Sequence, residues 1–160
     1  MNSFLQVSHD PYVVAASFAI ALFASYVTLD LARQVRNPAA QGARAWWAAG
    51  SVVMGTGIWS MHFLGMQAFE LPIAVGFDGV LTLLSWLVAV AAAGLALPFA
   101  SRPRPGWHHL ALGASILGLG ISGMHYIGMG AMEMAPGIVW DLPRVALSVL
   151  IAVLARLASA

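Results

Sequence analysis

The residues of this sequence that could do chemistry lie in a short motif that occurs twice. The motif reads Met-His-Phe-Leu-Gly-Met at 61–66 and Met-His-Tyr-Ile-Gly-Met at 124–129. Glycine, isoleucine, alanine and glutamate residues around the two copies match at the same offset. A constant offset over an extended segment indicates an internal repeat.

Each copy of the motif holds a histidine and a methionine that are four residues apart. His62 precedes Met66, and His125 precedes Met129. Residues at i and i+4 share one face of a helix, so each copy would present an imidazole beside a thioether. Two such faces brought together would offer two nitrogen and two sulfur donors, a set that suits copper and Cu(I) in particular. The repeat therefore predicts a metal site of the copper type.

Three other interpretations stay open. Methionine and aromatic side chains at helical spacing commonly fill a core, and Gly65 and Gly128 would let helices approach closely, so the motif could serve packing alone. Two histidines at similar depth on two helices could also be the axial ligands of haem b in an electron-transfer protein, although haem leaves the methionines without a use. A transporter fits least, because no carboxylate lies at mid-depth to couple ions.

Composition places the chain in a membrane. Its 160 residues are 61% hydrophobic and 8% charged, with no cysteine. So few charges cannot solvate a globular surface of this size. Without cysteine, a disulfide framework, thiolate catalysis and a cysteine-based zinc site are excluded, and a formal net charge of +1 gives no basic face for nucleic acid. No acid, base and nucleophile converge at one depth, so we expect no enzymatic activity from this chain.

The apolar segments predict an all-α fold, a polytopic transmembrane helix bundle with about five spans. The expected helices cover about 11–29, 45–69, 79–100, 107–132 and 142 to the end of the chain. The uncharged core of the last helix, between Arg144 and Arg156, is short for an independent span. This helix could still cross if both arginine side chains reach toward the interface.

Arginines predict the orientation of the bundle. Most of them lie in the loops after the first and third helices: Arg33, Arg36, Arg44, Arg102 and Arg104. The positive-inside rule makes these loops cytoplasmic and places the N-terminus outside, so both histidine motifs lie near the outer face. No basic residue precedes the first apolar run, so we expect a retained membrane helix and not a cleaved signal peptide.

The first, third and fifth helices share a second, weaker repeat. Each begins with an aspartate that is followed at a constant interval by a serine: Asp10 and Ser17, Asp78 and Ser85, Asp141 and Ser148. The simplest arrangement within this single domain is a two-helix unit used three times, over about 10–70, 78–133 and, in part, 141–160. A third histidine motif would fall beyond Ala160, so we expect either a fragment of a longer protein or a shortened version.

These motifs resemble the MHYT domain, a bacterial integral-membrane sensor module named for a Met-His-Tyr-Thr motif that recurs in three of its membrane helices. The resemblance rests on Met-His-Phe-Leu at 61–64 and Met-His-Tyr-Ile at 124–127, and on an opening, His9-Asp10 with 24–32, that is similar to the family's first helix. It covers essentially the whole chain. The chain departs from the family at Leu64 and Ile127, which replace the motif's threonine, and in lacking the third motif.

The resemblance implies a multi-pass sensor in the bacterial cytoplasmic membrane, in contact with membrane lipid. It also implies copper bound near the outer face, a diatomic gas such as O2, CO or NO as the signal, and a cytoplasmic cyclic-di-GMP or kinase output domain. Carried onto this sequence, the candidate copper ligands are Met61, His62, Met66, Met124, His125 and Met129, with His9 as an addition.

Overall fold

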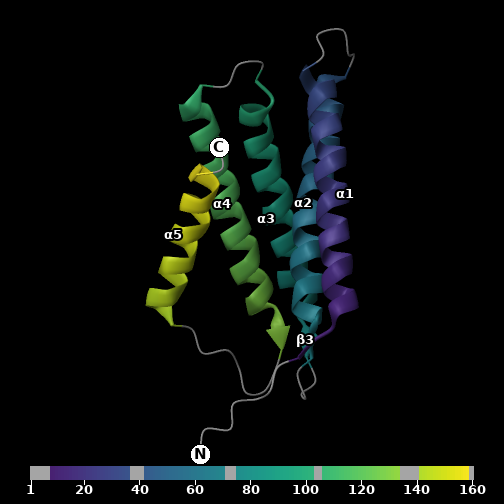
Figure 1. Cartoon of the computed structure of the whole chain (residues 1–160), viewed down its shortest axis with the longest axis vertical. Coiled ribbons are helices and arrows are strands. Elements are labelled where there is room, and N and C mark those ends of the chain that lie inside the picture. Colours follow the sequence, from purple (N-terminus) through teal and green to yellow (C-terminus); the bar gives the residue numbers. More distant parts are fainter. Residues whose placement is uncertain (1–7, 37–41, 71–74, 103–105, 134–140, 159–160) are drawn as a thin grey trace, which may run out of the picture.

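Five helices run side by side in the computed structural model, which describes residues 8–36, 42–70, 75–102, 106–133 and 141–158 (Figure 1). They are α1 (Pro11–Arg36), α2 (Ala43–Gln67), α3 (Gly79–Ala100), α4 (Trp107–Gly130) and α5 (Leu142–Ala158). The predicted all-α helix bundle is thereby confirmed.

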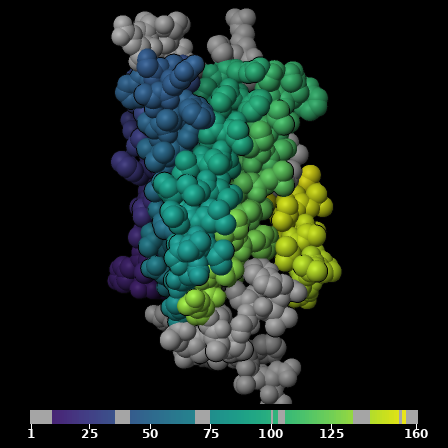
Figure 2. All heavy atoms as spheres, turned by 180° about the vertical axis from the view of Figure 1, so that it is seen from behind, coloured from purple at the N-terminus to yellow at the C-terminus, as the bar shows by residue number. Residues whose placement is uncertain are grey.

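Each helix packs mainly on its neighbours in the sequence. α2 and α4 also touch each other, and α5 packs mainly on α4 (Figure 1). From the opposite side, α3 lies between α2 and α4, and α5 stands at the edge of the bundle against α4 (Figure 2). α1 and α3 both end, and α2 and α4 both begin, at one end of the bundle, whereas α2 and α4 both end, and α3 and α5 both begin, at the other. Of the arginines predicted in the loops, Arg33 and Arg36 lie at the end of α1 and Arg44 at the start of α2, because both helices extend past the apolar runs. Arg104 lies outside the described residues.

Two short antiparallel ladders close the helix pairs at this second end. β1 (Ser8–His9) pairs with β2 (Phe69–Glu70), and β3 (Gly76–Phe77) pairs with β4 (Met132–Glu133). Strands of two residues carry no periodic signal, so the sequence did not predict them. The ladders make α1 and α2 one closed unit, here called the first hairpin, and α3 and α4 another, the second hairpin.

The aspartates at the starts of α1, α3 and α5 cap these helices. The backbone N–H of Tyr12 donates to Asp10 Oδ1 at 2.8 Å, that of Leu81 to Asp78 Oδ1 at 2.7 Å, and that of Arg144 to Asp141 Oδ1 at 3.3 Å. Such caps satisfy donors that the first turn of a helix leaves unpaired. The backbone N–H groups of Asp10 and Asp78 also donate to the carbonyls of Ala68 and Ala131, at 3.0 and 2.8 Å, which ties the two ends of each hairpin together.

Glycine brings the helices within each hairpin into close contact. A Cβ added at Gly57 would lie 2.2 Å from Cβ of Ala24 across the α1–α2 interface. A Cβ added at Gly120 would lie 2.1 Å from Cβ of Ala92 across the α3–α4 interface. Close backbone approach of this kind is a main source of helix association in membranes.

Tryptophan side chains join the first hairpin to the second. Three indole Nε1–H groups donate across the α2–α3 interface: Trp47 to the Gly94 carbonyl at 2.9 Å, Trp59 to Ser85 Oγ at 2.9 Å, and Trp86 to Thr56 Oγ1 at 3.0 Å. Interhelical hydrogen bonds of polar groups stabilise helix pairs in an apolar environment.

The outer surface is that of a membrane protein. Among the described residues, three helical segments are long and apolar enough to cross a bilayer: Pro11–Val35, Gly79–Phe99 and Trp107–Gly130. The apolar part of α5, Leu142–Ala152, is shorter. Large apolar side chains such as Phe18, Leu22 and Phe23 are exposed on α1, as expected of a surface in contact with lipid. The number of spans and the outside position of the N-terminus stay predictions.

Candidate metal centre

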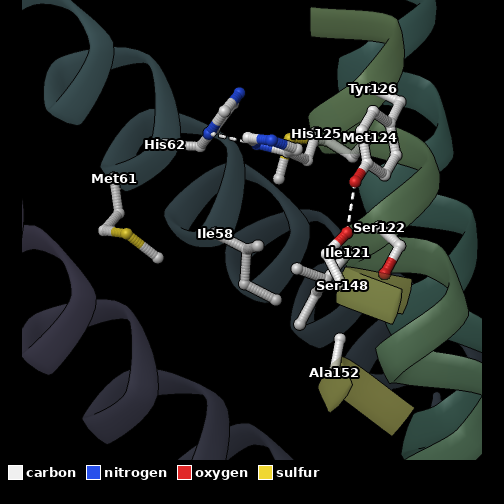
Figure 3. A pocket seen from close by; sticks show the side chains of 10 residues that line it. All are labelled: Ile58, Met61, His62, Ile121, Ser122, Met124, His125, Tyr126, Ser148 and Ala152. Atoms are coloured by element: carbon white, nitrogen blue, oxygen red, sulfur yellow. Dashed lines mark hydrogen bonds between the residues drawn. The ribbon is translucent and has the colours of Figure 1, made fainter. Parts of the chain in front are cut away.

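His62 of α2 and His125 of α4 meet between the two hairpins (Figure 3). Their Nδ1 atoms are 3.4 Å apart, and the ring centroids are 4.8 Å apart at an interplanar angle of 67°. Both side chains are half-buried. The two histidines of the repeated motif therefore form a pair, and each hairpin contributes one of them.

Gly128 makes room for this pair. A Cβ added at Gly128 would lie 3.1 Å from Nε2 of His62 and 3.3 Å from Cε2 of Phe63. Gly65 holds the equivalent position in the first copy of the motif, yet a Cβ added there would meet nothing within 4 Å. The two copies are thus alike in sequence but differ in surroundings. Gly128 lies against the histidine of the other copy, whereas Gly65 does not.

A pocket of about 350 Å³ lies beside the histidine pair, with walls from α2, α4 and α5. The residues that line it are Ile58, Met61, His62, Ile121, Ser122, Met124, His125, Tyr126, Ser148 and Ala152 (Figure 3). The hydroxyl groups of Tyr126 and Ser148 are hydrogen-bonded to each other across the α4–α5 interface. The pocket therefore combines apolar walls with imidazole and hydroxyl groups.

The methionines of the motif divide into two groups. Met124 is 1% exposed and lines the pocket, and Met61 also lines it but is 38% exposed and points away from the histidine pair in Figure 3. Met66 and Met129 are half-buried and are not among the residues that line the pocket. The backbone of His9 pairs with Phe69 at the same end of the bundle, but its side chain lies outside the described part of the structure.

The two Nδ1 atoms lie at hydrogen-bond distance, and the same separation is compatible with two imidazole ligands of one metal ion. Two metal–nitrogen bonds of about 2.0–2.1 Å at a tetrahedral angle place their nitrogens roughly 3.3–3.4 Å apart. Nε2 of His62 is buried and has no hydrogen-bond partner among the described residues, so the ring is only partly satisfied as it stands. Within the described ranges, no three His, Cys, Asp or Glu side chains cluster as a metal site. Further ligands from these ranges would be thioethers, and Met124 lies nearest to that role because it is buried on the pocket wall.

Sequence reasoning did not include the hydroxyl groups of the pocket among the site residues. Tyr126 lies inside the second motif and Ser148 belongs to the aspartate–serine repeat, so the sequence marks both only as parts of a repeated pattern. Their meeting depends on how α5 packs on α4. The one available signal was that Tyr126 replaces Phe63 of the first motif and adds a polar group.

Comparison with known proteins identifies the family. The profile of the MHYT family, described as a bacterial signalling protein N terminal repeat, matches residues 55–113 and 118–159, more than half of the chain. The chain belongs to the MHYT family. The two matched segments begin at Gly55 and Gly118, which are equivalent positions of the internal repeat.

Three relatives of this MHYT domain are signalling proteins. The chain is 48% identical over 148 residues to the bifunctional diguanylate cyclase/cyclic di-GMP phosphodiesterase MucR of Pseudomonas aeruginosa, a match that covers 92% of this chain and 22% of the relative. It is 41% identical to the cyclic di-GMP phosphodiesterase NbdA of the same species, over 91% of this chain and 18% of the relative. It is 32% identical to the signaling protein YkoW of Bacillus subtilis, over 97% and 19%.

This chain spans about a fifth of the length of these curated relatives. It is therefore an MHYT membrane sensor domain of the kind found in signalling proteins, and the catalytic activities in the relatives' names are those of the longer proteins. No solved structure matches the chain.

Proposed function

We propose that this MHYT domain binds a copper ion between His62 and His125 and senses a diatomic gas, O2, CO or NO. The observation that carries the proposal is the 3.4 Å separation of the two Nδ1 atoms, which suits two imidazole ligands of one ion. Imidazole with thioether is a donor set that favours copper. Bound copper would supply a soft centre with an open coordination position for the gas.

The residues around the pair support this role. His62 and His125 would hold the ion from separate hairpins, and Met124 offers a buried thioether on the pocket wall. The linked hydroxyls of Tyr126 and Ser148 fix α5 against α4 on another wall. A ligand shifts a conformational equilibrium only if it binds one arrangement better than another, and groups held by two separate hairpins provide such a difference.

We also propose that the signal passes to a cyclic-di-GMP output domain in the cytoplasm, in a longer protein. The support is that two relatives are named for the synthesis or the hydrolysis of cyclic di-GMP, and that the chain covers about a fifth of each. A kinase output domain is the alternative.

Copper content tests the site. Protein purified in detergent after growth with copper is expected to hold about one copper per chain by elemental analysis. A His62→Ala, His125→Ala double variant is expected to lose it, because both imidazole ligands are removed. The matched control is His108→Ala, His109→Ala, which removes a second pair of neighbouring rings, 4.0 Å apart at the start of α4 and outside the pocket.

Copper retained in the His62, His125 double variant would contradict the proposal. An iron-containing sample with a Soret band would favour haem b instead. Protein without any metal that keeps its fold would favour the interpretation of the motif as helix packing.

A further inference from the structure

The two hairpins differ at positions next to the histidine pair. Trp59 precedes the first motif where Ser122 precedes the second, and Phe63 of the first motif corresponds to Tyr126 of the second. The serines that follow on the next helix, Ser85 of α3 and Ser148 of α5, are equivalent as well. The α2–α3 and α4–α5 interfaces can therefore be compared residue by residue.

At the α2–α3 interface, aromatic side chains fill the space. The indole of Trp59 donates to Ser85 Oγ at 2.9 Å, and its ring lies 4.5 Å from that of Phe63. Phe63 is only 6% exposed and lies 5.6 Å from Phe77, measured between ring centroids. These aromatic side chains fill the α2–α3 interface beside the first motif.

At the α4–α5 interface, the equivalent space is open. Ser122 is too small to cross it, and its hydroxyl donates within α4 to the Gly118 carbonyl at 3.0 Å. The partner serine, Ser148, is instead bound by the Tyr126 hydroxyl. The pocket of about 350 Å³ lies here, bounded by Ser122 on α4 and Ala152 on α5, and it reaches both histidines (Figure 3).

We propose that Ser122 holds open the path by which a small uncharged molecule reaches the histidine pair, and that the side chain at this position sets the size limit of that molecule. This inference rests on the proposed function, because it takes the histidine pair as the sensing site. Serine stands where the first hairpin has tryptophan, and the pocket lies beside this serine.

The pocket lining defines the chemical class of the ligand. Ile58, Ile121 and Ala152 make the walls apolar, and the described residues that line the pocket include no charged side chain. A charged molecule would lose its hydration there without gaining a partner ion. Imidazole and hydroxyl groups can form a hydrogen bond to a polar atom of the ligand. The ligand is thus a small uncharged molecule that fits a pocket of about 350 Å³.

Chemical modification of the histidines tests this access path without any metal. The probe is diethyl pyrocarbonate, a small uncharged reagent that modifies imidazole, applied to the chelator-treated full chain and followed by mass spectrometry of each histidine peptide. Ser122→Trp is expected to slow modification of His62 and His125 on the order of tenfold, because close-packed protein excludes the reagent. His108 and His109, at the start of α4, serve as internal controls and are expected to react at the unchanged rate.

Two control variants separate pocket filling from other effects. Ser122→Ala keeps the pocket open, and Leu119→Trp adds the same indole to α4 at a side chain that is 55% exposed and outside the pocket. Both are expected to react like the unchanged chain. Ala152→Phe fills the pocket from α5 and is expected to slow both histidines as Ser122→Trp does. Loss of the fold would speed modification, so it cannot imitate the expected result.

Unchanged modification of His62 and His125 in both Ser122→Trp and Ala152→Phe would overturn the inference. This failure is distinct from failure of the proposed function. Slowed modification in a protein that binds no copper overturns only the copper proposal, whereas normal copper binding with unslowed modification overturns only the access path.

Discussion

Position 57 accepts no side chain larger than hydrogen without moving a helix. In Gly57→Ala the new Cβ would lie 2.2 Å from Cβ of Ala24, so α1 must shift away from α2. Overpacking of this kind costs about 1–3 kcal/mol. We expect a lower midpoint of thermal unfolding in detergent, measured by circular dichroism.

Gly65→Ala is the matched control within the same helix. Its Cβ would meet nothing within 4 Å, and alanine favours a helix over glycine by up to about 1 kcal/mol. The midpoint should stay the same or rise. Equal losses in both variants would show that the close contact at Gly57 contributes nothing specific.

At the same residue scale, the sequence predicted the histidines better than their methionine partners. The repeat indicated that His62 and His125 belong together, and they lie 3.4 Å apart between their Nδ1 atoms. Met66 and Met129 share a helix face with these histidines in principle, but the pocket does not include them. A spacing of four residues fixes neighbours along one helix, whereas the contact of Gly128 with His62 joins two helices. That contact is tertiary, so spacing alone could not predict it.

The first turn of α3 is capped by Asp78. Asp78→Ala removes the acceptor of the Leu81 N–H, a bond of 2.7 Å, and the loss of such a cap costs about 0.5–2 kcal/mol. We expect a lower unfolding midpoint and faster amide exchange in the first turn of α3. Asp78→Asn keeps an oxygen acceptor and should restore most of the stability.

Asp141→Ala provides the comparison for this cap. Asp141 is exposed and its bond to the Arg144 N–H is longer, at 3.3 Å, so the loss should be smaller than at Asp78. A larger effect at Asp141 would contradict the assignment of Asp78 as the stronger cap.

The sequence predicts a helix boundary correctly where a capping residue or a turn marks it. α3 covers the predicted 79–100, because Asp78 caps its start and a turn follows at Ser101. α1 continues to Arg36, past the predicted end at 29, since the prediction counted only the apolar run and charged residues such as Asp30 and Arg33 can continue a helix. The strand ladders join residues far apart in the chain, and no local pattern of two residues announces them.

The orientation of the whole bundle can be tested with single cysteines, because the chain has none of its own. Arg102→Cys and Asp141→Cys place a thiol at opposite ends of the bundle, and both positions are exposed. The positive-inside rule predicts that a membrane-impermeant maleimide labels Asp141→Cys on intact cells and Arg102→Cys only after lysis. The reverse pattern would place the histidine pair near the cytoplasmic face.

For the molecule as a whole, repeat and hydropathy together predicted a membrane bundle but did not fix the number of spans. α2 is 25 residues long, yet the segments that meet both length and hydropathy criteria in the described part of the chain come from α1, α3 and α4. The glycines and tryptophans that let α2 pack against its neighbours also lower its hydropathy. Helix packing favours these residues, whereas membrane insertion favours more apolar ones. Hydropathy alone therefore does not decide whether α2 spans the membrane.

The ladders that close the hairpins have a mechanical consequence. Each hairpin is tied at one end by a strand pair and held by a glycine contact between its helices, so we expect its two helices to move together as one body. His62 and His125 stand on different bodies. Any chemistry that changes the distance between the two rings must therefore either turn a ring or displace one body against the other. In the second case, a change in bonding at the histidine pair would displace the helix ends at the opposite end of the bundle.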